Sequence, residues 1–227
     1  MKILLVSATV HEIKPLLGRL KKVPGSENLW SGKLGKNRVD ALVTGVGMTA
    51  SAFHLALVLR TKYDLAVQAG FAGSFRKDIP LGTLVDVRSD VFSDLGTEDG
   101  DRFLTLKEMG LSKVSSLKSP ARTETVRSGG QVSSPKIQTG LRKAKGITVN
   151  TVHGNAASIR KVLRKFNPDV ESMEGAAFFF ACGESRMPCI QVRAISNYVE
   201  RRNKKNWKLE IAGKKLNNFL GNFLKNI

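Results

Sequence analysis

Two glutamates stand at positions where a carboxylate could act on a sugar. Glu12 follows the first apolar run of the chain, residues 2–7, and could serve as a general base. Glu174 begins a predicted helix within Met173-Glu174-Gly175-Ala176-Ala177, where it could accept two hydrogen bonds from a diol such as ribose O2′ and O3′. The helix dipole also favours acidic residues in a first turn, which is a purely structural explanation for both. Each glutamate alone is therefore a weak signal.

A glycine-rich segment, Gly70-Phe71-Ala72-Gly73-Ser74, follows the buried run 65–69. We predict a tight turn here, whose backbone N–H groups, including those of Ala72 and Gly73, could meet a ligand. An ordinary turn without a ligand explains the composition as well. The segment is neither G-x-G-x-x-G nor a P-loop with Gly-Lys-Ser/Thr, which disfavours a dinucleotide or a nucleoside triphosphate.

A third motif, Arg193-Ala194-Ile195-Ser196-Asn197, lies at the end of a predicted strand. The Asn197 amide offers both a donor and an acceptor, which suits recognition of a purine edge. A turn-forming Ser-Asn pair is the alternative explanation. In parallel sheets, ligands lie outside the carboxyl ends of strands, and all these motifs follow strands.

The histidines and cysteines predict neither a metal site nor a cofactor. His11-Glu12 begins like the zinc motif H-E-x-x-H, but residue 15 is proline, and neither His54 nor His153 has ligand spacing to it. Cys182 and Cys189 form no C-x-x-C pair; a disulfide between them is possible, but we expect reduced, buried thiols and hence a cytoplasmic protein.

The pattern of expected strands and helices, which must position these residues, predicts an α/β fold. We expect a single domain over residues 1–227, with a mixed, mostly parallel twisted central sheet between helices in a three-layer αβα arrangement. Strands are expected at 2–7, 30–34, 39–44, 65–69, 84–89, 147–152 and 189–195. Helices are expected at 11–20, 49–60, 174–184 and 206–224. Residues 113–145 show no clear period and predict a mobile insertion, or a loop with one helix.

The net charge of +18 is the unusual feature of the composition. Such an excess suits an anionic partner, and nucleic acid is the obvious candidate. However, the basic residues are scattered and no aromatic-interleaved platform accompanies them, so we expect a solvated basic surface and no nucleic-acid partner. No run approaches the roughly 18 apolar residues that would span a bilayer, so no membrane association is expected.

Together and in this order, the motifs resemble the nucleoside phosphorylase/nucleosidase superfamily. The resemblance is strongest to the branch of methylthioadenosine/S-adenosylhomocysteine nucleosidases and futalosine hydrolases. It is carried nearly end to end by Met1-Lys2-Ile3, Glu12, Thr44-Gly45-Val46-Gly47, Ala69-Gly70-Phe71-Ala72-Gly73, Met173-Glu174-Gly175-Ala176-Ala177 and Arg193-Ala194-Ile195-Ser196-Asn197.

Asn197 decides the branch. Adenosine-type nucleosidases are known for an aspartate here that protonates purine N7, which an amide cannot do. Asn197 can instead bond N7 and O6 of a 6-oxopurine. Residues 92–103 and 196–207 further resemble the futalosine hydrolases, which implies hydrolysis of futalosine to hypoxanthine and dehypoxanthine futalosine in menaquinone biosynthesis. The alternatives are a nucleosidase for methylthioadenosine/S-adenosylhomocysteine or inosine, and a catalytically silent, basic nucleic-acid-binding protein on the same scaffold.

The resemblance also implies roles for individual residues. Glu12 would be the base on water, Asn197 would stabilise the leaving base, and Glu174 with the Met173 backbone would hold ribose. Further substrate-site residues are implied, namely Ala72, Gly73, Phe103, His153 and Ser196, the last with Arg193 as support.

The sequence departs from the family pattern at one position, and the resemblance also implies an oligomeric assembly. Ser172 stands where many relatives carry an acid, which places more weight on Glu174 for ribose recognition. Relatives form homo-oligomers, a dimer or larger, in which a neighbour's loop covers the 5′ pocket, and residues 92–103 are the expected loop.

Overall fold

The computed structural model describes residues 1–118 and 137–227. Its strands are β1 (Lys2–Ser7), β2 (Lys21–Lys22), β3 (Leu29–Leu34), β4 (Asn37–Val43), β5 (Leu65–Ser74), β6 (Leu84–Asp90), β7 (Gly96–Asp99), β8 (Arg102–Thr105), β9 (Leu117–Lys118), β10 (Arg142–Thr148), β11 (Val170–Ser172) and β12 (Cys189–Tyr198). Its helices are α1 (Val10–Leu17), α2 (Met48–Val58), α3 (Ala156–Phe166), α4 (Gly175–Glu184) and α5 (Leu209–Asn226), with a short 3₁₀ turn at Lys204–Asn206.

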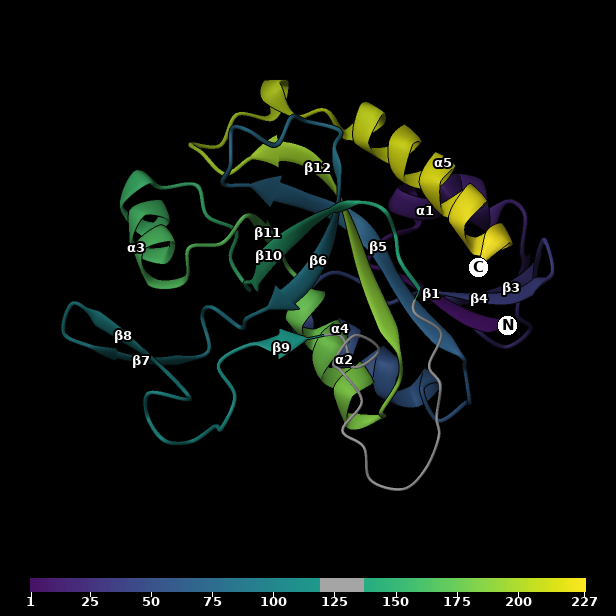
Figure 1. Cartoon of the computed structure of the whole chain (residues 1–227), viewed down its shortest axis with the longest axis horizontal. Helices are drawn as coiled ribbons and strands as arrows, with labels where there is room; N and C mark the ends of the chain where they lie inside the picture. Colours follow the sequence, from purple (N-terminus) through teal and green to yellow (C-terminus); the bar gives the residue numbers. More distant parts are fainter. Residues whose placement is uncertain (119–136) are drawn as a thin grey trace.

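The main sheet has the order β11-β10-β6-β12-β5-β1-β4-β3-β2 (Figure 1). Its centre is parallel, because β1 pairs in parallel with β4 and β5, and β5 pairs in parallel with β12. β6 and β3 join by antiparallel pairs. β11 pairs both with β10 and with the end of β5, which closes the series β5-β12-β6-β10-β11 on itself. This closure brings residues distant in sequence to the carboxyl end of β5.

Alternation along β1 shows how helices cover both faces of the sheet. Ile3 and Leu5 lie in a buried cluster with residues of α1 and α5. Leu4 and Val6 lie in a second cluster with Leu55 of α2 and residues of α4. Since successive side chains of a strand point to opposite faces, α1 and α5 cover one face and α2 and α4 the other. The predicted three-layer α/β fold is confirmed.

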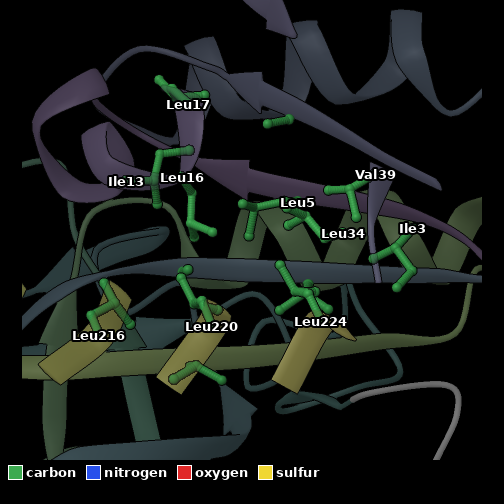
Figure 2. Packing of buried hydrophobic residues seen from close by; sticks show 14 of the residues in the cluster. Ile3, Leu5, Ile13, Leu16, Leu17, Leu34, Val39, Leu216, Leu220 and Leu224 are labelled. Atoms are coloured by element: carbon green, nitrogen blue, oxygen red, sulfur yellow. The ribbon is translucent and has the colours of Figure 1, made fainter. Parts of the chain in front are cut away.

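The first cluster shows why the C-terminal segment is a helix. Leu216, Leu220 and Leu224 of α5 recur at helical spacing, are fully buried, and belong to the same cluster as Ile13 and Leu16 of α1 (Figure 2). Within the described ranges, no helix is long and apolar enough to cross a membrane.

The predicted turn at 70–73 is wrong. β5 continues through Gly70, Phe71, Ala72 and Gly73, and β12 pairs with it as far as Tyr198. Glycine is unusual inside a strand and often marks a place where another group approaches the backbone closely. The glycines of β5 allow such close approach, as described below for the candidate site. The motif around Asn197 likewise lies within β12, and a register shift between Ile195 and Asn197 changes the direction of the side chains there.

Other boundaries also differ from expectation. β10 ends at Thr148, so the predicted strand 147–152 is wrong and His153 lies in a loop. α1 ends at Leu17, and its backbone leaves helical geometry at Ile13, two residues before Pro15. Residues 113–118 and 137–145 contain no helix, and the rest of the expected 113–145 insertion lies outside the described residues.

Cys182 of α4 and Cys189 of β12 are buried and form no disulfide, as expected. Burial raises the pKa of the Cys182 thiol, and the neighbouring Cys189 raises it further. The two thiols are therefore neighbours in the core.

Candidate active site

Glu12 is a buried carboxylate held by donors from three elements. Its Oε2 accepts hydrogen bonds from Thr9 N at 2.9 Å, Thr9 Oγ1 at 3.1 Å and Ser7 Oγ at 2.9 Å. Its Oε1 accepts from Phe71 N at 2.9 Å. The side chain is fixed where β1, α1 and β5 meet, in surroundings that suit an acceptor-only, ionised carboxylate.

Gly70 makes room for the charged groups of the site. A Cβ atom at this position would lie 2.8 Å from Glu12 Oε1 and 2.7 Å from Arg193 Nη1. Both atoms therefore pack directly on the backbone of β5, and any side chain here would displace them. The glycine that suggested a turn is required for this close approach.

Arg193 links the buried glutamines Gln68 and Gln191 to Glu174. It is 1% exposed, and its Nε and Nη2 donate to Gln191 Oε1 at 3.1 Å and Gln68 Oε1 at 3.0 Å. Its Nη1 lies 3.5 Å from Glu174 Oε2, while Glu174 Oε1 accepts from Gly47 N at 3.0 Å. Burial raises the pKa of Glu174, the Arg193 charge opposes this rise, and the nearby charge of Glu12 adds to it. The guanidinium thus offsets part of the repulsion between two buried carboxylates.

Small and polar residues shape the start of α4 behind Glu174. A Cβ at Gly175 would lie 2.2 Å from Asp90 Oδ2 and 2.5 Å from Gln191 Oε1, so only glycine fits. The Ser172 hydroxyl accepts from Gly175 N at 3.3 Å. Ser172 therefore supports the turn into the helix.

A separate pocket surrounds Gly73, three residues further along β5. Gly73 pairs with Glu171 of β11 on one side and with Asn197 of β12 on the other. The pocket lining contains these three residues together with residues 152–154 and with Tyr198, Glu200, Arg201, Arg202, Asn203, Asn206 and Trp207. Three residues of a strand span about 10 Å, which is comparable to the length of a nucleoside from ribose to base. The carboxylates around Gly70 and the pocket around Gly73 thus lie at successive places along the same strand.

The Asn197 amide is oriented by its neighbours. Its Oδ1 accepts from Ser196 Oγ at 2.8 Å, and its Nδ2 donates to Tyr198 O at 3.1 Å. Nδ2 also lies 3.2 Å from the place of a Gly73 Cβ. The single hydroxyl proton of Ser196 has a second acceptor within reach, Ala72 O at 3.4 Å. Ser196 and Tyr198 thus hold the amide in place, and both amide atoms keep capacity for a further partner.

The structure gathers most of the predicted site residues in two places. Two groups result, one of Glu12, Arg193 and Glu174 and one of Gly73, His153 and Asn197, with Ala72, Met173 and Ser196 adjacent in sequence.

Phe103 is the exception. It lies on the β7–β8 hairpin, which extends away from the sheet (Figure 1), and its ring is 6.5 Å from Phe166 of α3.

Sequence reasoning missed the role of Glu171. Its carboxylate accepts from His153 N at 3.0 Å and also contacts the ring nitrogen Nδ1 of the same residue. The pairing of β11 with β5 places it in the pocket, and no local pattern encodes that pairing. Among the described residues, no group of three or more His, Cys, Asp or Glu side chains could hold a metal ion.

A buried polar chain continues behind Arg193 to Asp90. Gln191 Nε2 donates to Asp90 Oδ2 at 3.3 Å, and Thr148 Oγ1 and Val91 N each donate to Asp90 Oδ1 at 2.9 Å. Burial raises the pKa of Asp90 to about 6, against these hydrogen bonds and the charge of Arg193. Burial therefore makes Asp90 easier to protonate than a free aspartate.

Asp90 is expected to destabilise the folded chain as the pH rises. Because its pKa is raised from 3.8 to about 6, the native state binds the proton more tightly than the unfolded state. Stability is lost as the pH rises between these values, by about 3 kcal/mol at most. Asp90→Asn should remove this part of the loss, measured as the change in urea unfolding free energy between about pH 4 and about pH 7. Equal changes in both chains would contradict the prediction.

Comparison with known proteins identifies the family of the chain. A family model described as "Phosphorylase superfamily" matches residues 2–225. A futalosine hydrolase from Streptomyces coelicolor is 32% identical over 218 residues, which cover 91% of this chain and 88% of that protein. A 5′-methylthioadenosine/S-adenosylhomocysteine nucleosidase from Glaesserella parasuis is 25% identical over 213 residues, covering 88% and 87%. The structure of a futalosine hydrolase mutant of Helicobacter pylori has the same fold, with a TM-score of 0.80 over 100% of both chains at 17% identity.

Proposed function

Because the chain belongs to the phosphorylase superfamily, we propose that it hydrolyses the N-glycosidic bond of futalosine and releases hypoxanthine. The Streptomyces relative, which covers most of the chain, is a futalosine hydrolase. The observation that carries the proposal is the combination of a buried, pre-positioned Glu12 carboxylate with an amide, not a carboxylic acid, at residue 197 in the neighbouring pocket. The first group suits activation of water, and the second suits a 6-oxopurine.

In the proposed reaction, each group acts on a different part of the substrate. Glu174 accepts hydrogen bonds from the ribose hydroxyls, and Arg193 keeps that carboxylate in place from 3.5 Å. Glu12 removes a proton from the attacking water and stabilises positive charge that develops on the sugar. Asn197 donates to the base as negative charge grows on it.

The donors around Glu12 favour hydrolysis over phosphorolysis. A phosphate at this place would need free N–H and O–H groups, but those of Ser7 and Thr9 are already directed at the Glu12 carboxylate. The carboxylate would also repel the phosphate. Water, which can donate to Glu12, is the nucleophile that fits.

The direct test is release of free base from futalosine, inosine and methylthioadenosine, with and without phosphate. We expect hypoxanthine from futalosine at a rate that does not depend on phosphate. Release of adenine only, or a requirement for phosphate, would overturn the proposal.

Asn197→Asp is expected to lower kcat/KM on futalosine by about 10- to 100-fold relative to that on methylthioadenosine. A carboxylate would meet O6 of hypoxanthine with lone-pair repulsion, and it would also face the Tyr198 carbonyl, to which Nδ2 now donates at 3.1 Å. The measurement is the ratio of the two kcat/KM values in wild type and variant. An unchanged ratio would refute the role of Asn197 in selectivity.

The proposal also covers assembly. α2 and α4 expose large apolar side chains, Phe53 at 61%, Leu57 at 49% and Phe180 at 48%, which suit burial against a second copy in a homo-oligomer. In such an assembly the hairpin carrying Phe103 could cover a neighbour's 5′ pocket. Sedimentation as a monomer would contradict this.

The proposal includes the domain organisation, the cellular location and the pathway of the enzyme. We place one nucleosidase domain over residues 1–227 in the cytoplasm, acting in menaquinone biosynthesis. Two cysteines without a disulfide support the location.

A further inference from the structure

The proposed reaction calls for a proton donor that Asn197 cannot be. When the C1′–N9 bond breaks, its electron pair moves to the purine, and a proton delivered there makes the base a better leaving group. Among the titratable side chains of the pocket, Glu200 is paired with Lys77 at 2.7 Å, and the Tyr198 hydroxyl is directed at the Lys77 carbonyl. The arginines do not release protons. His153 and the carboxylate beside it are the remaining groups.

The strand register places this pair opposite Asn197. Glu171 and Asn197 pair with the same residue, Gly73, from the two strands that flank the end of β5. Directly opposed residues of neighbouring strands point to the same face of a sheet. The absence of a side chain at Gly73 lets Val199 Cγ2 and Asn197 Nδ2 pack close to the β5 backbone, 2.9 Å and 3.2 Å from the place of a Cβ atom. Gly73, Glu171 and Asn197 all line the same pocket. A base bound in this pocket would therefore be within reach of both the Asn197 amide and the His153–Glu171 pair.

Glu171 holds His153 in one orientation. One carboxylate oxygen accepts from the His153 backbone N–H at 3.0 Å, and the other contacts ring nitrogen Nδ1. The Phe75 ring packs edge-on against the imidazole, with centroids 6.3 Å apart. The Glu171 side chain is 4% exposed and that of His153 is 16% exposed, so the carboxylate is the buried partner and the imidazole reaches the pocket. With Nδ1 engaged, Nε2 is the nitrogen available to a ligand.

We propose that His153 is the general acid of the reaction and that Glu171 is its positioning residue. The C1′–N9 bond breaks and its electron pair goes to the purine, while the proton on Nε2 of the imidazolium moves to a purine ring nitrogen. The water oxygen bonds to C1′, and the water proton passes to Glu12. Afterwards Glu12 returns this proton to solvent and His153 takes one up. The negative charge of Glu171 balances the imidazolium, as a carboxylate does for histidine in other catalytic arrangements.

This inference rests on the proposed nucleoside hydrolysis, and its test compares leaving groups. The substrates are futalosine, inosine and p-nitrophenyl β-D-ribofuranoside, whose nitrophenolate departs without a proton. His153→Gln is expected to lower kcat on the purine nucleosides by about 10²- to 10³-fold, and to change kcat on the nitrophenyl riboside by less than about 5-fold. Glu171→Gln should show the same dependence on the leaving group with smaller losses. His54→Gln is the matched control, since His54 contacts Asn28 away from the pocket, and it should leave all rates unchanged.

Each outcome bears on the general acid separately from the proposed function. Equal losses on all substrates would mean that His153 has a structural role only, and unchanged purine rates would remove it from the chemistry. If wild type ignores futalosine but cleaves inosine, the substrate assignment fails while the comparison of inosine with the nitrophenyl riboside still tests His153. If His153→Gln does not fold, judged by its melting temperature, Glu171→Gln gives the same comparison.

Discussion

Replacing Glu12 with glutamine is expected to lower kcat on the nucleoside substrate by about 10³-fold or more. A positioned general base typically contributes about 10²- to 10⁴-fold, and the Glu12 charge also stabilises the cationic sugar in the transition state. Glutamine has neither a basic oxygen of comparable strength nor a negative charge. The measurement is single-turnover release of hypoxanthine by wild type and Glu12→Gln.

The hydrogen bonds of Glu12 set the controls for this substitution. Both carboxylate oxygens accept, one from Phe71 N and the other from Ser7 and Thr9, so the amide NH₂ of glutamine must face a donor. We therefore expect a stability loss of about 1–3 kcal/mol. Binding of hypoxanthine, for which we propose the Gly73 pocket, should change little. Ser7→Ala removes one donor but keeps the carboxylate, and should retain most activity. A fully active Glu12→Gln chain would exclude Glu12 as the base.

The layers and the identity of the motifs could be predicted because they are local. A short stretch of chain is enough to predict each of these elements: the strand from the apolar run 2–7, the helix α5 from the spacing of its leucines, and the start of α4 from the Met173–Ala177 segment. The resemblance then supplied the association of Glu12, Glu174 and Asn197, which are far apart in sequence. In the structure, Glu12 bonds to Phe71 of β5, Asn197 pairs with Gly73 of β5, and Glu174 is linked to Arg193 of the neighbouring strand β12.

The contacts that depend on strand pairing could not be predicted. Glu171 and His153 are 18 residues apart, and the pocket they share with Asn197 exists because β11 turns back onto the end of β5. The same limit explains Gly70 and Gly73: glycine inside a strand and glycine in a turn look alike in a sequence. Only the packing distinguishes them, that of Glu12 and Arg193 on Gly70 and that of Val199 and Asn197 on Gly73. Phe103 was placed in the site by resemblance, and within one chain the hairpin does not reach it.

The second large effect is expected for Gly70→Ala, which changes no charged group. The added methyl would lie 2.8 Å from Glu12 Oε1 and 2.7 Å from Arg193 Nη1, and each of these atoms is held in place by other partners. We expect kcat to fall by about 10²-fold, because a displacement of about 1 Å in catalytic geometry has effects of that size. Stability should fall by about 1–3 kcal/mol through overpacking. The measurements are steady-state kinetics and urea unfolding.

Gly183→Ala provides the matched control. Its Cβ would meet nothing within 4 Å, and it lies within α4, where alanine is favoured over glycine by about 1 kcal/mol. It should keep full activity and gain slight stability.

A double substitution separates a specific effect of Gly70 from general damage. If Gly70→Ala acts by moving the Glu12 carboxylate, it has little left to disturb once Glu12→Gln has removed the base. The two losses in kcat should then be far from additive, with the double variant close to Glu12→Gln alone. Additive losses would mean that the methyl acts elsewhere, through Arg193 and its contact with Glu174, and that the glycine in β5 serves the ribose side of the site rather than the base.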